Sequence, residues 1–276
     1  MYTINCKGKL LVIDQPRVIG IINATPDSFF EGHLSKEMDS IITLSGTMLA
    51  DGAAILDIGG QSTKPGSKKI SAAEEISRVV PVIEAIAQQY PEAIISVDTF
   101  YSAVALAAVK AGACIVNDVS GGTLDMDMLN VVAELKTPFI CMHMQGTPET
   151  MQQQTTYQNV VTDVLDYLSR RVDSCRKAGI NDVIVDPGFG FGKTIQQNFQ
   201  LLKNLSAFTI LDAPLLVGLS RKSTIYKTLH VTAADALNGT TSLNTIALLN
   251  GASLLRVHDV KDAWQAVQLV EAYKRG

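Results

Sequence analysis

The sequence predicts an α/β protein, a (β/α)8 TIM barrel preceded by a short N-terminal β-hairpin. Short apolar runs rich in β-branched residues recur eight times, and each is followed by a turn and a longer stretch with helical spacing. The runs are almost continuously apolar, as in a parallel sheet covered on both faces. No Pro- or Ser-rich linker divides the 276 residues, and one barrel commonly occupies about 250 residues. We therefore expect a single domain over residues 1–276.

The hairpin is the first predicted element, and its strands lie at 3–6 and 10–14 around a Gly8-Lys9 turn. This hairpin, residues 3–14, is expected to plug the N-terminal end of a barrel that occupies residues 18–274. The predicted barrel strands are residues 18–23, 54–59, 94–99, 114–119, 138–144, 182–186, 214–219 and 253–258. The helices with the clearest apolar stripes are predicted at 72–89, 160–177, 233–250 and 259–274.

Composition and charge exclude several classes of protein. The net charge of −4, from 23 Lys and Arg against 27 Asp and Glu, argues against binding to nucleic acid or to a membrane surface. The content of 47% hydrophobic and 18% charged residues argues against a disordered chain. The four cysteines show no CxxC spacing and are predicted to be reduced. Without a signal-like N-terminus or an apolar run of about 18 residues, a cytoplasmic protein is expected.

Acidic and amide side chains follow several predicted strands, at the end where TIM barrels carry their active sites. Asp57, Asp98 and Asp186 each lie at or near such an end, and Asn117 lies at another. Carboxylate oxygens suit two adjacent N–H donors, as on the edge of a flat, guanidine-like nitrogen heterocycle. These residues therefore predict a pocket for such a ring.

Basic residues follow the late strands, where barrels often bind phosphate. Lys222 lies beyond the seventh strand, and Arg256 and His258 alternate along the eighth, so that they face the same side. Asn23, at the end of the first strand, offers a neutral oxygen that can help hold Mg²⁺ together with phosphate oxygens and water. The prediction is an anion pocket beside the ring pocket.

Other polar features have simpler interpretations. The GFGFGKT run at 188–194 is one residue short of a phosphate-binding P-loop, so we interpret it as a glycine turn that exposes Phe191 beside a ligand. No HxH or HExxH spacing indicates zinc. Residues predicted as helix caps or supporting groups are Asp118, Ser120, Asp125 and Asp259.

Five motifs in order closely resemble those of the dihydropteroate synthase family. They are NATPDSF at 23–29, DIGGQSTKPG at 57–66, NDVSG at 117–121, DPGFGFGK at 186–193 and SRKS at 220–223, and the resemblance covers residues 18–259. It implies a pterin-binding barrel that joins 6-hydroxymethyl-7,8-dihydropterin diphosphate to 4-aminobenzoate in folate synthesis, releasing diphosphate. It also implies Mg²⁺ as cofactor and a homodimer.

The resemblance implies roles for individual residues as well. The positions that match the family's pterin contacts are Asp98, Asn117, Asp186 and Lys222. Asn23 matches the Mg²⁺ contact. The positions that match diphosphate contacts are Thr63, Arg256 and His258. The positions around 4-aminobenzoate, where sulfonamides compete, are Phe29, Pro65, Phe191 and Ser223.

The chain departs from the family pattern in two predicted loops. Residues 30–33 read FEGH in place of the usual Ser-Asp-Gly-Gly run, and Gln61 and Lys64 replace the usual Glu and Arg. Lys64 keeps the charge of arginine but loses its bidentate fork. Our hypothesis is that Glu31 compensates by pairing with Lys64, which adds both residues to the candidate catalytic set of Asn23, Lys222, Arg256 and His258.

Two alternatives compete with the synthase interpretation. A pterin-binding barrel of the corrinoid-dependent methyltransferases would share the Asp and Asn contacts, but it would lack the TPDSF loop, the SRKS turn and the RxH pair found here. A non-catalytic pterin-binding paralogue is suggested by Gln61 and Lys64. The match at every other ring and diphosphate position favours the enzyme.

Overall fold

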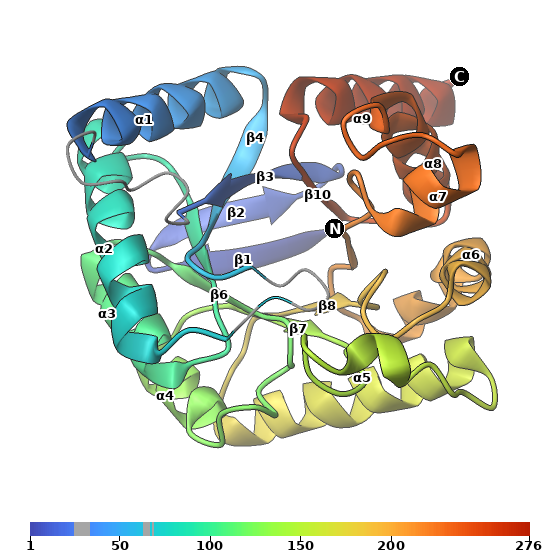
Figure 1. Cartoon of the computed structure of the whole chain (residues 1–276), viewed down its shortest axis with the longest axis horizontal. Coiled ribbons are helices and arrows are strands. Elements are labelled where there is room, and N and C mark those ends of the chain that lie inside the picture. The colour runs from blue at the N-terminus through green and yellow to red at the C-terminus, as the bar shows by residue number, and fades with distance from the viewer. Residues whose placement is uncertain (25–33, 63–66, 68) are drawn as a thin grey trace.

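The computed structural model describes residues 1–24, 34–62, 67 and 69–276. Eight parallel strands occupy its centre and helices surround them (Figure 1). The strands are β3 Arg17–Asn23, β4 Ala53–Gly59, β5 Ile95–Asp98, β6 Ile115–Asp118, β7 Phe139–Met142, β8 Val183–Asp186, β9 Leu216–Val217 and β10 Leu254–Val257. They hydrogen-bond in the order β8-β7-β6-β5-β4-β3-β10-β9, and a parallel bridge between Val185 and Leu215 closes the ring. The predicted fold class is confirmed.

The N-terminal hairpin is formed by β1 Tyr2–Cys6 and β2 Lys9–Ile13. The turn between these strands is Lys7-Gly8, whose φ angles of 52° and 94° are those of a tight hairpin turn. The prediction of a Gly8-Lys9 turn is therefore wrong by one residue, because Lys9 pairs with Cys6 in the ladder.

The hairpin covers the N-terminal end of the barrel, as predicted. Its inward side chains Ile4, Cys6, Leu11 and Ile13 share one apolar cluster with barrel residues Ile19, Ile55, Ile115, Ile140, Ile184, Leu216 and Leu254. In Figure 1 it crosses the middle of the ring of helices. Water is therefore excluded from that end, and ligands must enter from the other.

The predicted helices are present, and their observed ends differ from the predicted ends by a few residues at most. They are α1 Leu34–Ala50, α2 Ala72–Gln89, α3 Ser102–Ala111, α4 Met128–Leu135, α5 Val160–Ala178, α6 Ile195–Lys203, α7 Ser223–Leu229, α8 Leu237–Leu249 and α9 Val260–Arg275. The helix predicted from residue 233 begins at Leu237 because Thr232 and Asp235 form a turn, in which the Thr232 hydroxyl donates to the Asp235 carboxylate. No described helix is long and apolar enough to cross a membrane.

The barrel interior changes from apolar to polar along the strands. Side chains two residues apart on a strand face the same side. The apolar layer contains Ile55, Ile115, Ile184 and Leu254. Two residues further toward the C-terminal ends lie Asp57, Asn117, Asp186 and Arg256, in the same strands. The strand register therefore gathers the predicted site residues at one end of the barrel.

Candidate functional site

A hydrogen-bonded group of four side chains lies at the ends of β4, β5, β6 and β10. The Nε atom of Arg256 donates to Oδ2 of Asp57 at 2.6 Å, and an Nη atom of Arg256 donates to Oδ2 of Asp98 at 2.7 Å. Asn117 donates to the same Oδ2 atom of Asp57 at 3.0 Å. The group holds the guanidinium of Arg256 between two carboxylates, and charge-assisted bonds of this kind are short and strong.

Burial controls the charge of this group. It raises the pKa of Asp98 to about 7, against the opposing attraction of Arg256. Burial disfavours the guanidinium too, but Asp57 and Asp98 outweigh it and raise the pKa of Arg256 above its usual range. The Oδ1 atom of Asp57 is buried and has no hydrogen-bond partner among the described residues.

Asp186 ends β8 and begins the glycine-rich loop. Its Oδ1 atom accepts a 2.7 Å hydrogen bond from the Gly188 backbone. Gly188 has a φ of 70°, and a Cβ atom there would collide with the carbonyl oxygen of His143. Burial raises the pKa of Asp186, and the attraction of Lys222 opposes that rise. Only glycine permits this turn, which holds the carboxylate in place.

Lys222 meets the same loop from the other side. Its Nζ atom donates to the Phe189 carbonyl at 2.6 Å and lies 4.7 Å from the centre of the Phe191 ring. A cation over an aromatic face is stabilised by the ring quadrupole. Burial lowers the pKa of Lys222 to about 8, although Asp186 and Asp98 favour its charged form.

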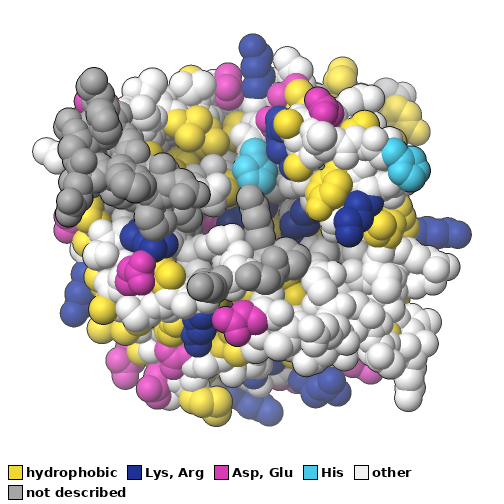
Figure 2. Space-filling view, viewed as in Figure 1, with side chains coloured by type: hydrophobic (Ala, Val, Ile, Leu, Met, Phe, Trp, Pro, Cys, Tyr) yellow, Lys and Arg dark blue, Asp and Glu magenta, His cyan; other side chains and the backbone are white. Residues whose placement is uncertain are grey.

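His258 lies just beyond β10 and is exposed. Its Nδ1 atom shares a 3.0 Å hydrogen bond with the hydroxyl of Ser220, which also accepts from the His258 backbone at 3.2 Å. Figure 2 shows histidine, Lys and Arg side chains near the upper middle of the view and toward the side that carries α7 and α8. The structure places Arg256 among the carboxylates, whereas the sequence grouped it with Lys222 and His258.

Asn23 ends β3 with its side chain exposed. No cluster of three or more His, Cys, Asp or Glu side chains able to hold a metal occurs among the residues that the structure describes. Mg²⁺ usually keeps several waters and takes one or two protein oxygens together with substrate phosphates. An exposed amide oxygen fits that kind of site, and Asn23 would be the residue that holds the ion.

The remaining predicted site residues divide into two groups. Ser223 is half-buried in the first position of α7, directly after Lys222. Residues that lie outside the described part of the chain are Phe29, Glu31, Thr63, Lys64 and Pro65. The structure therefore leaves the predicted pair of Glu31 and Lys64 as a prediction.

The predicted supporting residues do hold turns and helix starts. Asp118 accepts from the backbones of Ser120 and Gly122 at 2.7 and 2.8 Å, and Asp125 accepts from the backbone of Ser102 at 2.7 Å. Asp259 instead forms a two-pronged ion pair with Arg221, at 2.8 and 2.9 Å. None of these carboxylates is needed to explain ligand binding.

Two features of the site were missed from the sequence. Asp57 was predicted as a carboxylate of the ring pocket, but its hydrogen bonds with Arg256 and Asn117 were not predicted. Its position two residues after Ile55 in the same strand could have shown that its side chain faces the barrel interior. Lys193, predicted to lie in a turn, is buried, and its Nζ atom lies 2.9 Å from Nδ1 of His143.

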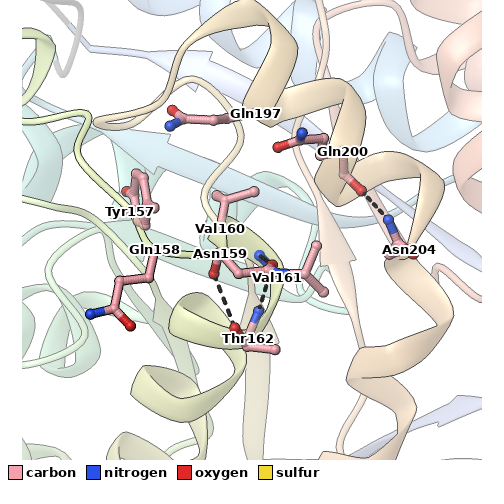
Figure 3. Close-up of a pocket in the computed structure, with 9 residues that line it drawn as sticks. All are labelled: Tyr157, Gln158, Asn159, Val160, Val161, Thr162, Gln197, Gln200 and Asn204. Atoms are coloured by element: carbon pink, nitrogen blue, oxygen red, sulfur yellow. Dashed lines mark hydrogen bonds between the residues drawn. The ribbon is translucent and has the colours of Figure 1, made fainter.

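A separate pocket of about 390 Å³ opens between the starts of α5 and α6 (Figure 3). Uncharged side chains line it, among them Tyr157, Asn159 and Gln197. The Asn159 side chain already accepts from two backbone N–H groups of α5. None of the predicted site residues that the structure describes lines this pocket.

Comparison with known proteins agrees with the geometry. A family model described as "Pterin binding enzyme" matches residues 19–258. Dihydropteroate synthase from Escherichia coli K12 is 41% identical over 268 residues, covering 96% of this chain and 94% of the relative. The Yersinia pestis dihydropteroate synthase structure with a sulfonamide drug complex covers 100% of both chains at 39% identity and a TM-score of 0.93. The Xanthomonas albilineans dihydropteroate synthase in complex with 7,8-dihydropteroate also covers both fully, at 36% identity and a TM-score of 0.89.

Proposed function

The chain belongs to the family of pterin-binding enzymes that contains the dihydropteroate synthases, and on that premise we propose which of its residues carry out the reaction. It is a transferase of folate biosynthesis. It condenses 6-hydroxymethyl-7,8-dihydropterin diphosphate with 4-aminobenzoate to 7,8-dihydropteroate and diphosphate. The observation that carries the residue assignment is the group in which Asp57, Asp98 and Asn117 surround the end of β10.

The pterin ring is bound by Asp98, Asn117, Asp186 and Lys222. Asp186 accepts from the N–H edge of the ring, because its carboxylate is buried and oriented by the Gly188 backbone. Lys222 donates from the opposite side of the glycine-rich loop, where Phe189 and Phe191 hold its ammonium.

The diphosphate is bound by Thr63, Arg256 and His258, and Asn23 is the residue that would hold Mg²⁺. When bound there, Mg²⁺ would supply positive charge against the negative charge that grows on the leaving diphosphate. Arg256 adds fixed positive charge, and Arg256 and His258 both supply N–H donors at the same place. When the Ser220 hydroxyl donates to Nδ1 of His258, the ring carries its proton on Nε2 and can donate it to a phosphate oxygen.

The 4-aminobenzoate is bound by Phe29, Pro65, Phe191 and Ser223. Its neutral amine attacks the pterin methylene, so that a C–N bond forms, the C–O bond to diphosphate breaks and the amine loses a proton. The carbon becomes cation-like and is stabilised by the electron-rich ring and the nearby carboxylates. Because the amine of 4-aminobenzoate is itself the nucleophile, the reaction does not depend on a Ser-His-Asp arrangement. Glu31 and Lys64 act as a charged pair of the two loops that carry them.

We further propose a homodimer that works in the cytoplasm. Apolar side chains of α8 and α9 are exposed next to a groove of about 390 Å³, and they are Ile246, Leu249, Leu269 and Tyr273. Exposed apolar surface of this kind is typical of a protein interface. All four cysteines are free thiols, as is usual in a reducing compartment.

Product analysis by liquid chromatography tests the proposal. Purified protein is incubated with the pterin diphosphate and 4-aminobenzoate, with Mg²⁺ or with a chelator, and we expect dihydropteroate only with Mg²⁺. Asp186→Asn should weaken binding of the pterin diphosphate in calorimetry, and Asp173→Asn, at an exposed position of α5, is the matched control. Unchanged pterin binding in Asp186→Asn would contradict the assignment of that residue. Binding without product would favour the non-catalytic paralogue.

A further inference from the structure

The glycine-rich loop after β8 is tied to the barrel by a buried lysine. Lys193 is only 3% exposed, and its Nζ atom donates to the carbonyls of Gly188 at 2.8 Å and Phe191 at 2.9 Å. The same atom lies 2.9 Å from Nδ1 of His143, at the end of β7. Among the described residues, the polar contacts of this side chain are all with the loop and with His143.

The two carbonyls that Lys193 binds lie at the two ends of the part of the loop that touches the site. Between them, the Phe189 carbonyl accepts from Lys222 at 2.6 Å. Gly188, at one end, donates to Asp186, and Phe191, at the other, places its ring 4.7 Å from the Lys222 ammonium. A shift of this loop would therefore move partners of both Asp186 and Lys222.

We propose that Lys193 is a positioning residue of the pterin pocket, which sets the loop at 188–192 so that Asp186, Lys222 and Phe191 take their binding geometry. This inference rests on the proposed function, because it takes the pterin contacts of Asp186 and Lys222 from it. Lys193 touches no substrate in this scheme and acts only through the loop.

His143 completes the anchor. Burial, and then the neighbouring Lys193, lower the pKa of His143 to about 2, so its ring is neutral at physiological pH. A neutral imidazole can either accept from a lysine ammonium or donate to a lysine amine through Nδ1. Burial also lowers the pKa of Lys193, but an amine still has two N–H groups for the two loop carbonyls. The anchor is therefore complete in either protonation state of the lysine.

Other side chains hold the loop from its outer side. Tyr157 donates to the Gly192 carbonyl at 2.8 Å, Gln152 donates to the Gly190 carbonyl at 3.0 Å, and Asn198 accepts from the Gly190 backbone at 2.7 Å. These contacts explain why removal of Lys193 should displace the loop without unfolding it. Lys193 differs from them because its partners, the carbonyls of Gly188 and Phe191, lie on either side of the Phe189 carbonyl that accepts from Lys222.

The test compares Lys193→Met, which keeps most of the length of the side chain but loses its donors, with Lys203→Met on the exposed end of α6. Steady-state kinetics are measured for both substrates, and circular dichroism reports whether each variant is folded. For Lys193→Met we expect the KM for the pterin diphosphate to rise by about tenfold, with a smaller change in kcat, because the lost contacts position the binding groups. Lys203→Met should match the wild-type protein.

A folded Lys193→Met with both KM values within about twofold of wild type would overturn the inference and leave the proposed function intact. So would a fall in kcat alone, because that pattern does not come from a displaced pterin pocket. If Lys193→Met does not fold, Tyr157→Phe tests the same loop from outside. It should raise the pterin KM about twofold to threefold, and no change would refute the inference. A wild-type chain that makes no dihydropteroate would overturn the proposed function itself, and this inference with it.

Discussion

Replacement of Glu75 by glutamine should make the protein more stable at neutral pH. Glu75 lies in the first turn of α2, where its side chain is fully buried and neither carboxylate oxygen has a hydrogen-bond partner among the described residues. Burial raises the pKa of Glu75 to about 8, against the opposing effects of the nearby Thr99 hydroxyl and of Arg78, and the charges of Asp98 and Asp118 add to the rise. The folded protein therefore keeps a proton that the unfolded chain releases.

The magnitude follows from the two pKa values. The ordinary value is 4.5, so the folded state binds more protons than the unfolded state between pH 4.5 and about 8, and stability falls as the pH rises through that range. At 1.36 kcal/mol for each pKa unit, retention of the proton costs about 3 kcal/mol at pH 7 and about 1 kcal/mol at pH 5. Glutamine is neutral at both pH values, so it does not have this cost. The stability advantage of Glu75→Gln over wild type should therefore be about 2 kcal/mol larger at pH 7 than at pH 5.

Urea unfolding at pH 5 and pH 7, followed by circular dichroism, measures this difference. The comparison between the two pH values cancels any fixed cost of the buried amide. Glu84→Gln, on an exposed position of the same helix, is the matched control and should show no such change. If the gain of Glu75→Gln differs by less than about 0.5 kcal/mol between the two pH values, the reasoning from burial is refuted.

Three further outcomes are expected. Asp57→Asn removes the negative charge that holds Arg256. A charge-assisted hydrogen bond contributes about 2 kcal/mol, so kcat/KM should fall roughly thirtyfold. Unchanged kinetics would contradict the importance of this pair. Thr194→Ala removes the capping box that Thr194 forms with Gln197 at the start of α6 and should lower the free energy of unfolding by about 1 kcal/mol in urea titrations. Leu269→Glu on the exposed face of α9 should convert the proposed homodimer to a monomer in light scattering, and a wild-type protein that is already monomeric would refute the dimer.

The strand-end residues could be predicted from the sequence because barrels follow a local rule. Asp57, Asn117 and Asp186 occupy the same position relative to the apolar residue two places before them, and that periodicity is visible in the chain. The hairpin could also be predicted, although its turn lies one residue earlier, because the ladder pairs Lys9 with Cys6. Local patterns thus gave reliable positions along each strand.

The partners of Arg256 could not be predicted in the same way. Asp57 is 199 residues away in the chain and Asp98 is 158 residues away. The sequence pattern grouped Arg256 with His258 because both follow one strand, but the closed ring places its guanidinium between carboxylates of β4 and β5. The choice between those partners depends on which strands are neighbours across the barrel.

The sequence by itself determined the class of fold, the face that carries the chemistry and the family motifs, because these depend on residue type and spacing along the chain. Only the tertiary structure decided that Arg256 binds two carboxylates, that Glu75 is buried without partners and that Lys193 anchors the loop beside Lys222. The physical reason is that burial and charge pairing depend on distances through space. Those distances exist only after the eight strands have closed, with helices packed around them.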